Sequence, residues 1–156
     1  MTSFKHLLSQ YVQSKRGNYL IPLLLGTCAY FLVIGPKALD PNNIAWLQAG
    51  DPAQHYLGWT FFRYSPWALP LGLNPNYGLD ISSSIVYSDS IPLLAIFFKL
   101  FSPWLPETFQ YFGLWYLLCF ILQAYFAYQL LRLITPNKAI STLGVIYFIF
   151  SPIRLS

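Results

Sequence analysis

TFQYFGLWYLLCFILQAYFAYQLL, residues 108–131, contains neither a charged residue nor a proline. About 20 apolar residues in an α-helix, at roughly 1.5 Å per residue, are enough to cross the hydrocarbon layer of a bilayer, which is about 30 Å thick. A second uncharged run, GNYLIPLLLGTCAYFLVIGP, covers residues 17–36. We therefore predict transmembrane helices at 18–35 and 108–131.

A third uncharged run begins at Ala139 and reaches Ser151-Pro152, shortly before Arg154. It predicts a third transmembrane helix at 139–153, which is too short unless further residues complete it. We therefore expect the chain to be the N-terminal part of a longer protein and to be inactive alone. Hydrophobic residues make up 56% of the chain and charged residues 9%, against about a quarter in soluble domains. The predicted fold class is all-α integral membrane.

Acids and bases occupy different segments. All five acids lie between the first two predicted helices, in residues 36–107: Asp40, Asp51, Asp80, Asp89 and Glu107. Bases gather before the first helix and in the connection at 132–138: Lys5, Lys15, Arg16, Arg132 and Lys138. Basic residues favour the cytoplasmic side. We therefore predict that residues 1–17 and 132–138 are cytoplasmic and that 36–107 form a long outer loop.

Several other classes are disfavoured by the sequence. The net charge of +4 comes from scattered bases, so no nucleic-acid partner is expected. A cleaved signal peptide is disfavoured, because no Ala-x-Ala cleavage site follows the first apolar run. Cys28 and Cys119 lie inside predicted helices, and His6 and His55 fall on opposite sides of the membrane, so no metal site built from cysteine or histidine is predicted. A divalent cation bound by carboxylates stays possible.

The outer loop is predicted to contain two short juxtamembrane helices. Asp51-Pro52 is typical of a helix start, with Asp as N-cap and proline in the first turn, and predicts a helix from Pro52 to Tyr64. Ser90-Ile91-Pro92 opens a second, apolar helix over 91–101. The segment between them, residues 65–89, is rich in turn signals and is predicted to be irregular.

The second loop helix is too short to cross a bilayer and is expected to lie along the membrane surface. Lys99 is expected to reach from this helix toward the lipid headgroups. Four tryptophans are expected to mark the membrane interface. They are Trp46, Trp59, Trp67 and Trp104.

Three strings carry a resemblance to a known group of proteins: DPAQHYLGWTFFRYSPW, NPNYGLDISSSIVYSDSIPLLAIFFKLFSP and TFQYFGLWYLLCFILQ. They resemble the N-terminal portion of a bacterial family of multi-span membrane proteins of unassigned function, which is itself similar to the GT-C glycosyltransferases. The resemblance covers most of the chain from about Gly50 to about Pro152. It implies a location in the bacterial inner membrane, where the distribution of basic residues predicts a cytoplasmic N-terminus.

The resemblance to GT-C enzymes implies a role for one acid. In those enzymes the first outer loop forms two juxtamembrane helices and carries an acid that acts as a base or binds a metal ion during sugar transfer from a polyprenyl phosphate. Asp51 stands at the matching place and is the implied catalytic residue. The family often has two adjacent acids or an acid-x-acid pattern, whereas Gly50 and Ala53 stand near Asp51 here.

Glycosyl transfer needs a carboxylate to take the acceptor proton or hold a divalent cation, and a cation or hydrogen-bond donors for the departing phosphate. Asp51 suits the first role. The predicted substrate-binding residues are Gln54, His55, Arg63 and Asp89. The expected partners are membrane lipid, a lipid-linked sugar donor, and further C-terminal helices or a partner subunit.

Two alternatives stay open at the level of the sequence. Asp51 can act only as a helix cap, and the other four acids can be caps, turn residues or partners of helix dipoles. The chain can also belong to a transporter or to a non-catalytic membrane scaffold that uses the loop for docking. Ion-coupled transport usually places charged residues inside the spans, and the predicted spans contain none.

Overall fold

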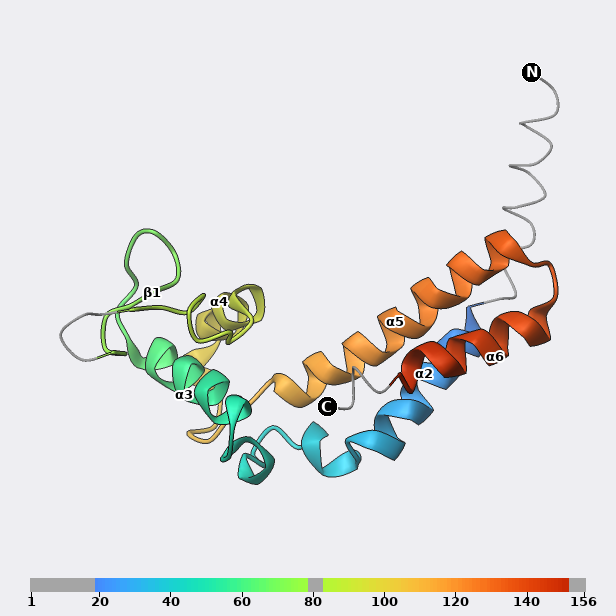
Figure 1. Cartoon of the computed structure of the whole chain (residues 1–156). Helices are drawn as coiled ribbons and strands as arrows, with labels where there is room; N and C mark the ends of the chain where they lie inside the picture. Colours follow the sequence, from blue (N-terminus) through green and yellow to red (C-terminus); the bar gives the residue numbers. More distant parts are fainter. Residues whose placement is uncertain (1–18, 79–82, 152–156) are drawn as a thin grey trace, which may run out of the picture. The chain divides into compact units, whose positions relative to one another are not determined.

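The computed structural model describes residues 19–78 and 83–151 and is mostly helical (Figure 1). It divides into two compact units, which we describe separately. The helical unit is Met1–Pro36 with Leu114–Ser156, and the aromatic unit is Lys37–Gly113. Asp80, the predicted cytoplasmic residues 1–17 and the end of the third predicted span, residues 152–153, lie outside the described residues.

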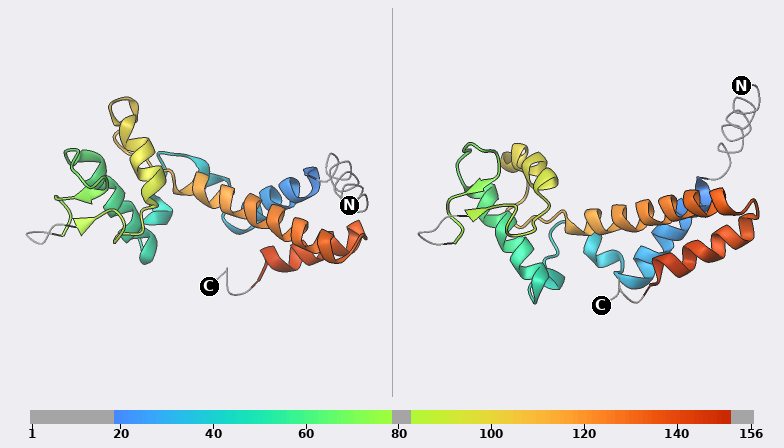
Figure 2. Two further views of the ribbon diagram at one scale, coloured as in Figure 1. Left: turned by 90° about the horizontal axis from the view of Figure 1, so that it is seen from above. Right: turned by 45° about the horizontal axis from the view of Figure 1, so that its top comes forward.

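Three helices form the described part of the helical unit: α2 (Leu20–Val33), α5 (Phe112–Ile134) and α6 (Lys138–Ile149). Figure 2 shows α2 and α6 alongside α5. Within the described ranges, α5 alone is long and apolar enough to cross a membrane. α2 has 14 residues and α6 has 12. The prediction of three spans is therefore not supported, and one candidate span stands in its place.

The helices end early for local reasons. α2 is followed by Gly35 at a φ of 88°, a left-handed conformation that stops a helix and favours glycine. α6 ends before Ser151-Pro152, where the proline disfavours helical geometry in the residue that precedes it. α5 also begins at Phe112, four residues later than predicted, because residues 109–111 are buried in the aromatic unit.

Close packing and one interhelical hydrogen bond hold the helical unit together. A Cβ on Gly26 of α2 would lie 2.7 Å from the Ile121 Cα of α5, so only glycine permits this approach of the two backbones. Gln123 of α5 donates to the Phe148 carbonyl of α6 at 2.9 Å. A longer α6 could not satisfy that carbonyl, because residue 152 is proline and has no N–H. Gln123 supplies the missing donor.

The aromatic unit contains both predicted loop helices, as α3 (Asp51–Tyr64) and α4 (Pro92–Leu100). It also has short 3₁₀ turns η1 (Pro36–Leu39), η2 (Ala45–Leu47) and η4 (Ser102–Trp104). β1 (Leu73–Asn74) pairs antiparallel with β2 (Ser83–Ser84), with Leu73 opposite Ser84. This strand pair was not predicted. The rest of segment 65–89 is irregular over its described residues, as predicted.

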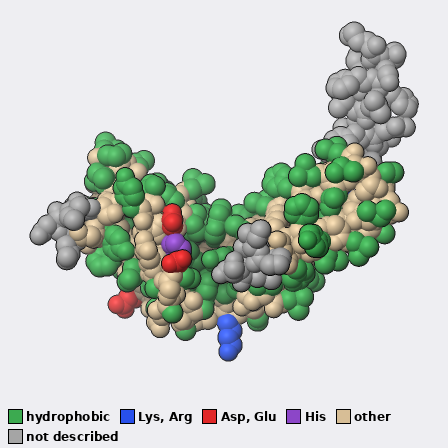
Figure 3. Space-filling model, in the orientation of Figure 1, with side chains coloured by type: hydrophobic (Ala, Val, Ile, Leu, Met, Phe, Trp, Pro, Cys, Tyr) green, Lys and Arg blue, Asp and Glu red, His purple; other side chains and the backbone are tan. Residues whose placement is uncertain are grey.

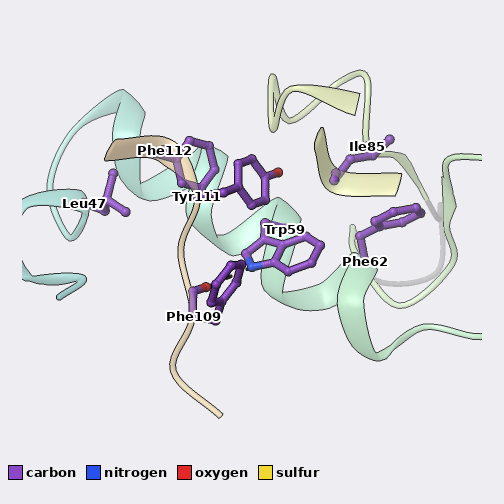
Figure 4. Close-up of a cluster of buried hydrophobic side chains, with 8 residues drawn as sticks. Leu47, Trp59, Phe62, Ile85, Phe109, Tyr111 and Phe112 are labelled. Atoms are coloured by element: carbon purple, nitrogen blue, oxygen red, sulfur yellow. Dashed lines mark hydrogen bonds between the residues drawn. The ribbon is translucent and has the colours of Figure 1, made fainter. Parts of the chain in front are cut away.

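Buried aromatic side chains form the core of this unit, and Figure 4 shows them converging from α3 and the segment before α5. Trp59 donates its indole N–H to the Phe109 carbonyl at 3.0 Å and meets the Tyr111 ring edge-on at 5.1 Å. Burial raises the pKa of Tyr111, so its phenol stays protonated and donates to the Ser90 carbonyl. The interface prediction is wrong for Trp59, which is a core residue. The complete cluster is Leu47, Trp59, Phe62, Ile85, Ala95, Phe109, Tyr111 and Phe112.

Lys99 does not point outward from α4, so the prediction that it reaches the headgroups is wrong. Its side chain is only 5% exposed. Its ammonium lies 4.0 Å from the centre of the Phe62 ring and 4.6 Å from that of Trp67, and it donates to the Pro66 carbonyl at 3.5 Å. The aromatic faces thus take the place of solvent around this cation.

The buried ammonium predicts a specific pH dependence of stability. Burial lowers the pKa of Lys99, so the folded chain releases this proton at a lower pH than the unfolded chain does. From the folded pKa up to the unfolded value of about 10.4, the unfolded state binds more protons and the free energy of unfolding rises with pH. Lys99→Met is expected to remove that rise and to change stability at pH 7 by less than about 1 kcal/mol, because methionine fills a similar space without a charge.

Thermal unfolding in detergent between pH 8 and 10.5 measures this difference. Lys37→Met, at an exposed lysine of the same unit, is the matched control and should leave the wild-type profile unchanged. Parallel profiles of wild type and Lys99→Met would show that burial does not affect the titration of Lys99.

Candidate functional site

The N-terminal end of α3 carries an acid that no capping contact uses. Gly50 is the N-cap, at a φ of 65° that favours glycine, and the helix starts at Asp51-Pro52. Asp51 is exposed and accepts no hydrogen bond from any residue in 19–78 or 83–151. The prediction that Asp51 is the N-cap is therefore wrong. Its position in the first turn places the carboxylate beside the positive end of the helix dipole.

Asp40 behaves differently and fits the structural role predicted for it. Its Oδ1 accepts from the Asn42 N–H at 2.9 Å, which closes a local turn. These two exposed acids of one unit thus differ in the hydrogen bonds that their carboxylate oxygens accept. Asp40 stabilises the backbone, whereas the Asp51 carboxylate is available to a ligand.

His55 lies one turn after Asp51, on the same face of α3. Its Nδ1 is 2.9 Å from the Ser88 carbonyl oxygen. A carbonyl can only accept, so Nδ1 carries the hydrogen and Nε2 is left with a lone pair in the neutral ring. Gln54 reaches the same segment and donates to the Tyr87 carbonyl at 3.4 Å.

The segment around Ser88 is held tightly against α3. Ser90 Oγ donates to the His55 carbonyl at 2.6 Å and lies 2.8 Å from Ser88 Oγ. A Cβ on Gly58 would lie 2.0 Å from Ser88 Oγ and 2.5 Å from Ser90 Oγ. Asn74, which is fully buried, donates to the Gly58 carbonyl at 3.0 Å. Only glycine at position 58 therefore permits the close approach of Ser88 and Ser90 to α3.

The backbone of this segment is strained beside His55. Asp89 has a φ of 48° and Ile91 a φ of 51°. The left-handed region is tolerated by Asp but is a genuine outlier for a β-branched residue such as Ile91. Such strain persists only where surrounding contacts enforce it, and it concentrates at functional sites. In Figure 3 the histidine lies between two acidic side chains on a mainly apolar face.

The structure brings four of the five predicted site residues to this end of α3: Asp51, Gln54, His55 and Asp89. It does not bring Arg63, which is twelve residues beyond Asp51 and so roughly 18 Å further along the helix. The Arg63 side chain is 7% exposed. Its guanidinium donates to four carbonyls at 2.7–3.1 Å, those of Ser102, Leu105, Pro106 and Glu107. It anchors the segment after α4 to α3.

A family model described as "Domain of unknown function (DUF6311)" matches residues 23–156. The chain belongs to the DUF6311 family. No curated protein and no solved structure matches the chain.

The site of this DUF6311 chain offers carboxylates but no closed metal cage. Within the described ranges, no three His, Cys, Asp or Glu side chains lie close enough together to hold a metal ion. Asp51 and Asp89 are both exposed. Either could contribute one carboxylate to a divalent cation whose other ligands are water and substrate phosphate oxygens, as Mg²⁺ is commonly bound.

Two residues that hold the aromatic unit of this DUF6311 chain together were missed by the sequence reasoning. Gly58 had no predicted role, although an isolated glycine inside a helix often signals close packing. Gln110 is 2% exposed, and its amide donates to the Ala38 and Asp40 carbonyls at 2.8 and 2.9 Å and accepts from the Gly113 N–H at 2.9 Å. It fastens the two ends of the aromatic unit together. A single polar residue in an apolar run gave no signal for that role.

Proposed function

We propose that the chain is the N-terminal part of a GT-C-like membrane glycosyltransferase that uses a polyprenyl-phosphate-linked sugar in envelope glycan assembly. One observation carries the proposal. The Asp51 carboxylate accepts no hydrogen bond within residues 19–78 and 83–151, because Gly50 takes the capping position. It lies one turn from a histidine whose orientation is fixed by a backbone carbonyl.

The chemistry assigns one step to Asp51. The acceptor hydroxyl attacks the anomeric carbon of the donor sugar, the bond from that carbon to the phosphate oxygen breaks, and the hydroxyl proton passes to the Asp51 carboxylate. The polyprenyl phosphate leaves with the electron pair. Arg63 cannot meet the new charge at this end of α3, because its terminal nitrogens are bonded to carbonyls. A divalent cation held by Asp89 would supply that stabilisation.

The exposed apolar side chains of the chain suit a donor that is held in a membrane. α4 and η4 expose apolar side chains, with Leu93 at 80% and Trp104 at 78%, and the candidate span α5 begins eight residues after Trp104. We propose that the aromatic unit lies at the outer membrane surface and that α2 and α6 enter the bilayer with α5. Both shorter helices expose large apolar side chains that lipid would cover, among them Leu20, Leu24, Leu32, Leu143 and Tyr147.

Substitution of the free carboxylate tests the enzymatic proposal. Asp51→Asn in the full-length protein is expected to lower glycan transfer at least about 100-fold, the usual contribution of a general base, while protein abundance is unchanged. Asp40→Asn is the matched control, since an Asn oxygen can still accept from the Asn42 N–H. Surface glycan composition and membrane protein abundance are measured in parallel. Wild-type glycans with normally abundant Asp51→Asn protein would refute catalysis at Asp51 and favour the scaffold or transporter alternative.

A further inference from the structure

The geometry around His55 points to a more specific role than general substrate binding. We infer that Nε2 of His55 accepts a hydrogen bond from a hydroxyl group of the sugar, and that the Ser88–Ser90 segment fixes the ring in the tautomer this requires. The inference rests on the proposed function for the identity of the ligand. The tautomer itself follows from the contacts of the ring.

The first step concerns the hydrogen on the ring. The Ser88 carbonyl holds Nδ1–H at 2.9 Å, and Ser90 Oγ holds the His55 carbonyl at 2.6 Å, so side chain and backbone of one residue are bound by one short segment. A neutral imidazole with Nδ1–H presents a lone pair at Nε2. No residue in the described part of the chain donates to that atom. The lone pair is therefore available to a donor that arrives with the substrate.

The second step concerns the charge of the ligand. Asp51 lies one turn from His55 on the same face, and Asp89 directly follows the residue that binds its ring. Two carboxylates disfavour an anion at this position, since like charges in close proximity repel. An ionised phosphate also has no hydrogen to donate to the Nε2 lone pair, so it is a poor ligand for His55 even where a divalent cation binds it. A neutral group that donates a hydrogen bond is suitable, and sugar hydroxyls are such groups.

The tautomer can be measured without knowledge of the donor sugar. Comparison with the spectrum of a His55→Asn variant identifies the His55 signal among those of the other histidines of the full-length protein. Nitrogen-15 NMR of the labelled full-length protein in bilayers, at a pH where the ring is neutral, is expected to show hydrogen on Nδ1 and none on Nε2. Hydrogen on Nε2, the form that predominates in free histidine, would overturn the inference whatever the activity of the protein.

A substitution at His55 distinguishes the role of Nδ1 from that of Nε2. In His55→Asn the amide N–H can replace Nδ1–H toward Ser88, while the acceptor at Nε2 is lost. Glycan output per protein molecule is expected to fall about tenfold, with melting temperature and abundance close to wild type. Unchanged output from His55→Asn, alongside loss in Asp51→Asn, would overturn the role of His55 and leave the proposed function standing. Unchanged output in both variants would refute the proposed function itself.

Discussion

Gly58→Ala is expected to lower the free energy of unfolding by about 3 kcal/mol, the upper part of the range for overpacked sites. Glycine to alanine inside a helix normally stabilises a protein by about 1 kcal/mol. At position 58 we expect the change in the free energy of unfolding to have the opposite sign. The new methyl group would lie 2.0 Å from Ser88 Oγ, inside the contact that joins α3 to the segment at 88–90. The substitution must displace that segment and with it the carbonyl that binds His55.

Chemical or thermal unfolding in detergent measures the effect. Leu57→Ala, at a half-exposed neighbouring position of α3, is the control and is expected to change stability by less than about 0.5 kcal/mol, as is usual at surface sites. If Gly58→Ala is as stable as wild type, or more stable, α3 and the segment at 88–90 are not in close contact.

Gln110→Leu is expected to lower the free energy of unfolding by at least about 2 kcal/mol, since each buried polar group left without a partner costs about 1–3 kcal/mol. Leucine has a similar size but would leave two groups unpaired, the carbonyl of Ala38 and the N–H of Gly113. The Asp40 carbonyl would keep its hydrogen bond from the Asn43 N–H at 3.1 Å. The two ends of the aromatic unit would lose their side-chain connection. The Pro41 carbonyl would still accept from the backbone N–H of residue 110 at 2.8 Å.

Unfolding of Gln110→Leu is compared with that of Gln48→Leu, which changes an exposed glutamine of the same unit. The control should stay within about 0.5 kcal/mol of wild type. Similar losses in both variants would indicate a general effect of the added apolar group and would contradict the connecting role of Gln110.

Local sequence signals predicted the loop helices well. Proline in the first turn and Ser-Pro after the last turn define α3 in the sequence as they do in the structure, because both effects act within a few residues. The same reasoning predicted α4 from Ile91-Pro92 to Phe101, within one residue at each end. What it could not predict was which face of α4 is buried, since Lys99 turns inward only because Phe62 and Trp67 surround it.

Contacts distant in sequence account for what was missed. Asp51, His55 and Asp89 were predicted for one site, but the hydrogen bond from His55 to Ser88, which joins positions 33 residues apart, was not. No periodicity reveals such a pairing. The role of Arg63 was mistaken for a similar reason: its partners lie 39–44 residues later, and they are backbone carbonyls that any sequence would provide.

The accumulated donor lipid tests the central claim most directly. If the protein transfers a sugar from a polyprenyl phosphate through Asp51, its donor should accumulate when the transfer is blocked. Mass spectrometry of membrane lipid extracts is expected to show the same polyprenyl-phosphate-linked sugar enriched in cells that lack the protein and in cells that carry Asp51→Asn, but not in cells that carry Asp40→Asn. Lipid extracts identical to wild type in both the deletion and the Asp51→Asn cells would contradict the claim.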